Sequence, residues 1–96
     1  QLDQRLAVRY HLSELDEHET GEYILHRLNI AARTAELFTA QAMHVIYQAS
    51  SGIPRVINSL CDMCLLVGFG QKLNLIDAET SQEVIKDYQE ARVRRV

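Results

Sequence analysis

The sequence of 96 residues is poor in the residues that interrupt or cross-link a chain, with one proline, four glycines and two cysteines. No apolar run approaches the roughly 18 residues that a membrane span needs, and we find no signal peptide. Two cysteines without secretory features predict reduced thiols in a cytoplasmic protein. A glycine-rich phosphate loop, a nucleophile elbow and an HExxH motif are also missing, so we expect no complete active site in this sequence.

What the sequence does contain is an ordinary globular composition with a small excess of acidic residues. Hydrophobic residues make up 47% and charged residues 24%, and the formal net charge is −3. Because general nucleic-acid binders are usually basic, this charge disfavours that class of function. A chain of this length buries about 60–70% of its unfolded surface, enough for one small domain. Since it begins at Gln1 rather than methionine, we expect it to belong to a longer protein.

Apolar residues recur at intervals of three and four, which predicts an all-α fold: a small bundle of about four helices. Residues 1–9 are interpreted as the end of an earlier helix. No segment shows the alternation typical of a strand. The four predicted helices cover approximately residues 16–32, 39–51, 54–69 and 77–92. The third has the most regular apolar stripe, so we expect it at the centre of the bundle.

Capping signals mark the predicted helix ends. Asp16 and Glu19 have the spacing of a capping box, and Thr39 and Asp77 are of the residue type that caps a helix N-terminus. Gly52 is suited to the left-handed conformation that ends a helix. The starts of three helices and the end of one are therefore predicted from local chemistry alone.

The stretch SSGIPRVIN, residues 50–58, places an arginine where a helix dipole favours acids. The first helical turn offers free N–H groups and a partial positive charge, both of which attract anions. Arg55 adds a planar cation with forked donors, and Pro54 restricts the backbone that carries it. This combination suits a phosphate group. The alternative is an ordinary surface arginine at a helix start.

The other side chains with ligand chemistry are interpreted as core or surface residues. Cys61 and Cys64 have CxxC spacing, but a structural zinc site needs four ligands and the sequence has no second pair. The two cysteines also lie in mid-helix on the apolar face, unlike a redox pair at a helix N-terminus, so we predict core thiols and no metal site. The histidines are scattered, and we expect them to be solvated: His11, His18, His26 and His44.

Three segments, residues 10–28, 37–66 and 75–88, resemble the C-terminal helical lid of AAA+ ATPases. The closest likeness is to the general secretion pathway protein A (GspA/ExeA-like) group, and transposition helper ATPases are similar. The GIPR motif followed by INSLCD is the most specific part of the resemblance. It implies that residues 1–12 are the end of an AAA+ core domain and its connector, and that residues 13–96 form the lid.

The resemblance also implies roles for individual residues. Arg55 would be the sensor-2 arginine, reaching the β- and γ-phosphates of ATP bound with Mg²⁺ in the core domain. Ile53 and Pro54 would lie near the adenine. Arg5, in the segment LDQRL, matches the position of an arginine finger, which acts on the ATP of a neighbouring subunit. The phosphate-binding loop and the Mg²⁺-ligating acid would belong to the upstream core, so this part alone is not expected to hydrolyse ATP.

The implied partners are the upstream AAA+ core domain, neighbouring subunits of a homo-oligomer, and components of a secretion or export system. The implied location is the cytoplasm, peripheral to the inner membrane through these partners. Nucleic acid is not expected as a partner. Two alternatives remain: a helical protein-interaction module without a nucleotide role, and a DNA-associated lid of a transposition helper ATPase. In the second alternative a basic tail, otherwise a solvated helix end, contacts phosphates: Arg92, Arg94 and Arg95.

Overall fold

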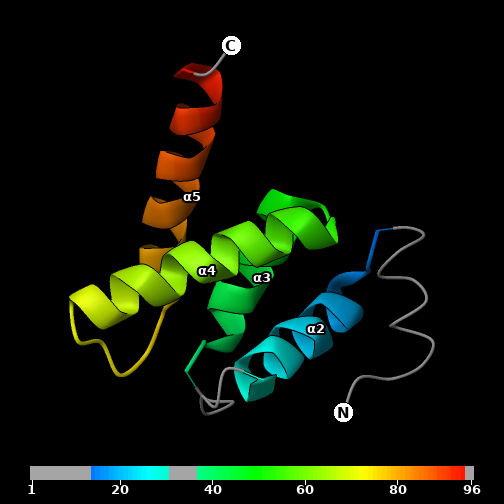
Figure 1. Ribbon diagram of the computed structural model, residues 1–96. Coiled ribbons are helices and arrows are strands. Elements are labelled where there is room, and N and C mark those ends of the chain that lie inside the picture. The colour runs from blue at the N-terminus through cyan, green and yellow to red at the C-terminus, as the bar shows by residue number, and fades with distance from the viewer. Residues whose placement is uncertain (1–13, 31–36, 95–96) are drawn as a thin grey trace.

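The computed structural model describes residues 14–30 and 37–94, which form four α-helices (Figure 1). The helices are α2 (Glu17–Ile30), α3 (Ala40–Ser50), α4 (Pro54–Gly70) and α5 (Ala78–Arg94). The described ranges contain no named strand, so the predicted all-α bundle is confirmed. None of the helices in these ranges is long and apolar enough to cross a membrane. The following predictions fall outside the described residues: the helix end in 1–9, the domain boundary after residue 12, Arg5, His11 and Arg95.

The predicted helix starts are confirmed by their hydrogen bonds. The Asp16 N–H donates to Glu19 Oε1 at 2.9 Å, and the Glu19 N–H donates to Asp16 Oδ1 at 2.8 Å, which completes the capping box. Side-chain oxygens of Thr39 and Asp77 each accept from the backbone N–H three residues later, at 3.0 and 2.8 Å. The bonds from Thr80 lower the pKa of the Asp77 carboxyl, because they stabilise its charged form.

The α3 and α4 helices form the centre of the bundle, and α2 and α5 lie on opposite sides of this pair (Figure 1). Each of the two central helices packs against the other three, so α4 shares the central position predicted for it with α3. The predicted apolar stripes supply most of the core. Three residues of the predicted stripes, Ala49, Leu65 and Tyr88, are only half-buried, whereas Ser50 and Val56, which are outside the stripes, are buried. The largest fully buried apolar side chains are Ile24, Ile46, Ile57, Leu60 and Ile76.

A short parallel bridge joins the starts of α3 and α5. The Ile76 N–H donates to the Leu37 carbonyl at 2.7 Å, and the Thr39 N–H donates to the Ile76 carbonyl at 3.0 Å. Ile76 and Phe38 are both buried there. The sequence alone does not predict this bridge, because a single bridge has no periodic signal. The bridge fixes where α5 begins relative to α3.

The two cysteines are core residues, as predicted. Cys61 is 3% exposed and Cys64 is fully buried. Burial, with a smaller contribution from Cys64, raises the pKa of the Cys61 thiol to about 12. Burial likewise raises the pKa of Cys64 to about 11, although its contact with Ser81 Oγ at 3.9 Å opposes the shift. Neither thiol has the lowered pKa of a reactive cysteine.

The central position of α4 can be tested with Leu60→Ala. Leu60 is fully buried, so truncation removes apolar contacts and leaves a cavity, and we expect a loss of about 2–5 kcal/mol in the free energy of unfolding. Leu66, on the same helix, is 71% exposed, and Leu66→Ala should stay within about 0.5 kcal/mol of wild type. Denaturant unfolding measures both. Similar values for the two variants would contradict this packing of α4.

The cysteine environment predicts inert thiols in the folded protein. With a pKa of about 11, on the order of one Cys64 thiol in a thousand is ionised at pH 8, and only the thiolate reacts with iodoacetamide. We therefore expect no alkylation of Cys61 or Cys64 in native buffer and alkylation of both in denaturant, as measured by mass spectrometry. Rapid labelling of the native protein at either cysteine would contradict the burial of these two thiols on α4.

Candidate functional site

The candidate site begins at the turn between α3 and α4, which two consecutive left-handed residues form. Ser51 has φ 53° and Gly52 has φ 76°. The Ser51 N–H donates to the Tyr47 carbonyl at 2.9 Å, and the Gly52 N–H donates to Ser50 Oγ at 3.1 Å. The sequence predicts a left-handed residue at Gly52. The structure places the helix cap one residue earlier, at Ser51, and extends the left-handed conformation through Gly52.

Gly52 also lies directly against the backbone that precedes α2. The Leu15 N–H donates to the Gly52 carbonyl at 2.8 Å. A Cβ atom added to Gly52 would lie 1.9 Å from the Leu15 carbonyl oxygen, far closer than any van der Waals contact allows. A glycine is thus required here both by its positive φ and by the available space. The contact fixes the turn to the start of α2.

The α4 helix then starts at Pro54, which occupies the first turn as predicted. Ile53, before the proline, has an extended backbone (φ −78°, ψ 116°), and its carbonyl accepts from the N–H groups of Val56 and Ile57. The first turn contains no acidic residue. The only side chain of this turn with a formal charge is therefore Arg55.

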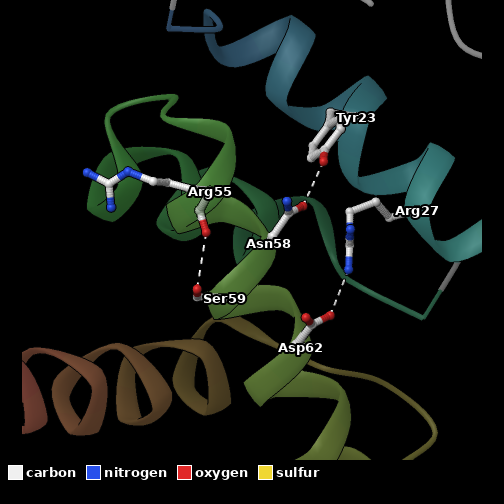
Figure 2. A network of polar contacts seen from close by, with 6 residues as sticks. All are labelled: Tyr23, Arg27, Arg55, Asn58, Ser59 and Asp62. Atoms are coloured by element: carbon white, nitrogen blue, oxygen red, sulfur yellow. Dashed lines mark hydrogen bonds and ion pairs between the residues drawn. The ribbon is translucent and has the colours of Figure 1, made fainter. Parts of the chain in front are cut away.

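Arg55 is exposed, and Figure 2 shows its guanidinium pointing away from α2. The Arg55 backbone carbonyl accepts a hydrogen bond from Ser59 Oγ at 3.1 Å. This contact is made by the backbone, so the guanidinium takes no part in it. Among the residues that the structure describes, no carboxylate forms an ion pair with it. The guanidinium is thus free to bind an anion brought by another domain or molecule.

The α4 helix is also held to α2 by two polar contacts (Figure 2). Tyr23 Oη donates to Asn58 Oδ1 at 2.7 Å, and the Arg27 guanidinium donates to Asp62 Oδ1 at 2.8 Å. Burial is the largest single effect and opposes the charged form of Arg27, but the hydrogen bonds and charges of Asp62 and Tyr23 together outweigh it, so the pKa of Arg27 is raised. The sequence analysis missed this network. The sequence did contain a signal: Tyr23 and Arg27 are four residues apart, and so are Asn58 and Asp62.

Arg55 lies at the rim of a cleft between α4 and α5. Two adjoining hollows, of about 310 and 400 Å³, share the lining residues Arg55, Tyr88 and Arg92, and we call them together the arginine cleft. Ile53 is among the described residues that line it, and Pro54 is not. The apolar floor consists of Ile53, Val56, Leu60 and Ile85.

Arg92 is exposed near the end of α5, as predicted for a solvated helix end, and it also lines this cleft. Its Nη1 donates to Tyr88 Oη at 3.3 Å, and its guanidinium carbon lies 5.7 Å from the centre of the Tyr88 ring. This distance is within the range of a cation–π contact. Arg94 is the last residue of α5.

The histidines do not gather at the site. His18 and His44 are exposed, as predicted, and each lies beside a carboxylate: Glu22 at 3.7 Å and Glu17 at 2.6 Å. The second pair joins α2 to α3. His26 is half-buried, contrary to the prediction of a solvated side chain, because it lies on the part of α2 that faces the bundle. Within the described ranges no three histidine, cysteine or acidic side chains are placed to share a metal ion.

Comparison with known proteins identifies one curated relative. Over 71 residues, 74% of this chain, the sequence is 38% identical to General secretion pathway protein A of Aeromonas hydrophila. The two proteins are related over this segment. The chain spans 13% of the length of that relative, so the similarity covers a small part of a much larger protein. No protein-family model and no solved structure gives a significant match.

The close contact at Gly52 predicts a large effect of one methyl group. Gly52→Ala places a Cβ against the Leu15 carbonyl and strains a positive φ, so we expect a loss of about 2–3 kcal/mol in unfolding free energy. Gly21→Ala is the matched control: no atom lies within 4 Å of its Cβ, and in mid-helix it should stabilise by about 0.5–1 kcal/mol. Thermal melts of both variants measure the difference. Equal melting temperatures would contradict the contact.

Proposed function

We propose that this chain is the nucleotide-sensing lid of an oligomeric AAA+ ATPase in a secretion or export system, with Arg55 as the sensor-2 residue. The relationship to General secretion pathway protein A supports the secretion context. The GIPR motif supports the lid assignment by resemblance. The observation that carries the proposal is the position of Arg55: an exposed guanidinium without an ion pair among the described residues, on the first turn of α4.

The physical basis of the proposal is electrostatic. The first turn of α4 contains no acidic side chain, and the lining of the arginine cleft contains none among the described residues. An arginine fork that has no internal partner is suited to a phosphate group, to which it can donate two parallel hydrogen bonds. The N-terminal end of the helix dipole adds to the attraction.

In this proposal ATP binds with Mg²⁺ to the upstream core domain, and Arg55 reaches its β- and γ-phosphates from the lid. Ile53 and Pro54 lie near the adenine, and Arg5 acts on the ATP of the neighbouring subunit. Loss of the γ-phosphate removes negative charge opposite Arg55, which weakens the attraction and lets the lid open. Such hinge motion is a common way to couple a nucleotide state to a neighbouring domain.

Three hydrogen bonds support the proposal that such a motion would reach other parts of the bundle. The backbone bond between Leu15 and Gly52 joins the turn before Arg55 to the start of the lid, close to the predicted boundary after residue 12. Farther along the two helices, the hydrogen bonds from Tyr23 and Arg27 attach α2 to α4. Displacement of Arg55 by a phosphate is therefore expected to move α2 and α4 together.

A second candidate, the helical interaction module, is favoured by a different observation. Three large apolar side chains at the end of α4 and in the segment after it are more than half exposed: Leu66, Phe69 and Leu75. Exposed apolar groups of this size are typical of contact surfaces. In this candidate Arg55 has no role in nucleotide binding.

The deciding experiment compares ATP turnover by the full-length parent protein with that of its Arg55→Ala variant. Removing a charged hydrogen-bonding partner costs about 1.5–3 kcal/mol, so we expect turnover to fall by roughly 10- to 150-fold. Lys86→Ala is the matched control, because it removes the same charge from α5 outside the arginine cleft. Circular dichroism checks that each variant is folded. Equal turnover by wild type and Arg55→Ala would refute the lid proposal and favour the interaction module.

A further inference from the structure

We propose that Arg92 on α5 is a second phosphate-binding cation of the arginine cleft, so that α4 and α5 together contact the nucleoside triphosphate. This inference rests on the proposed function and extends it to a helix to which neither the sequence nor the resemblance gave a nucleotide role. It starts from the observation that both hollows of the cleft are lined by Arg55 and by Arg92. The two arginines come from opposite ends of their helices, Arg55 from the first turn of α4 and Arg92 from the last turns of α5.

The Arg92 side chain is already held in place by its neighbour on the helix. Tyr88 precedes it by one turn, and its hydroxyl accepts from Arg92 Nη1 at 3.3 Å. The Tyr88 ring lies under the guanidinium, at 5.7 Å. Fixing a long side chain before the ligand arrives reduces the conformational entropy lost on binding. Tyr88 also lines both hollows, and is therefore a positioning residue for Arg92.

The charge of the cleft is unusual for this chain. The whole sequence has 13 acidic and 10 basic residues, yet the described residues that line the arginine cleft include two arginines and no acid. Two guanidinium groups at one cleft repel each other unless an anion lies between them. The acidic residue of α4 is Asp62, and its carboxylate is already bonded to Arg27. The cleft thus favours a ligand with several negative charges.

The shape of the cleft matches a nucleotide better than a simple anion. One hollow is lined by apolar side chains as well as by the two cations, and both hollows have the volume of small-molecule sites. An elongated polyphosphate carries several charged groups and can place a different one against each guanidinium. A wider hollow of about 540 Å³ along α5 is lined by both Lys86 and Glu90, and this mixed charge gives it no preference for anions.

The test is the affinity of the full-length parent protein for ATP, measured by calorimetry on wild type, Arg55→Ala, Arg92→Ala and the double variant. We expect Arg92→Ala to weaken ATP binding by about tenfold. The double variant should lose less than the product of the two single losses, because both arginines contact the same phosphate chain. Tyr88→Phe, which keeps the ring but removes the hydroxyl, should weaken binding by about two- to threefold. Lys86→Ala should leave the affinity unchanged.

The outcomes separate this inference from the proposed function. If Arg55→Ala weakens ATP binding and Arg92→Ala behaves like Lys86→Ala, the role of Arg92 is refuted and the lid proposal stands. If neither arginine affects ATP binding, both are refuted. Duplex DNA is measured in parallel: a salt-dependent loss of DNA binding in Arg92→Ala, with unchanged ATP affinity, would assign Arg92 to a DNA backbone contact and overturn the inference.

Discussion

The position of Arg55 depends on the backbone contact between Gly52 and Leu15. Because Gly52 has no side chain, the two backbones approach closely enough for the Leu15 N–H to bond to the Gly52 carbonyl at 2.8 Å. This contact sets the direction in which the chain enters α4, and Pro54 then restricts the first helical turn. The direction of Arg55 is therefore determined by backbone geometry, with no side-chain partner among the described residues. Because the backbone determines its direction, an arginine of this kind can stay in place when a ligand leaves.

The α4 helix carries two kinds of polar side chain. Toward α2 it presents Asn58 and Asp62, each bonded to a side chain of that helix, and this face is structural (Figure 2). At the cleft with α5 it presents Arg55, whose guanidinium has no ion pair among the described residues. Pairing on one face keeps the acid Asp62 bonded to Arg27, so Asp62 does not neutralise Arg55. In a chain with net negative charge, this arrangement preserves a local cationic cleft for an anionic ligand.

The features that the sequence predicted are the local ones. The capping box of Asp16 and Glu19, the cap at Thr39 and the start at Pro54 follow from residues within one turn of each other, and the structure confirms them. The bridge at Ile76 and the place of Arg92 depend on how helices far apart in sequence meet, and a one-dimensional pattern does not contain that information. The sequence correctly predicted an exposed Arg92 near a helix end, but not its place beside Arg55. The roles of Arg5 and Arg55 remain predictions from the resemblance.

The floor of the arginine cleft is also part of the protein core. Val56, Leu60 and Ile85 line the cleft and are buried among the apolar side chains of the bundle. A ligand that draws α4 and α5 together therefore acts on close-packed residues, which transmit displacement because they compress little. α4 is joined to α2 by polar bonds and to α3 by packing, so the bundle is expected to respond as one body. In the proposed function, this coupling converts the charge of a phosphate into a movement of the N-terminal end of the lid.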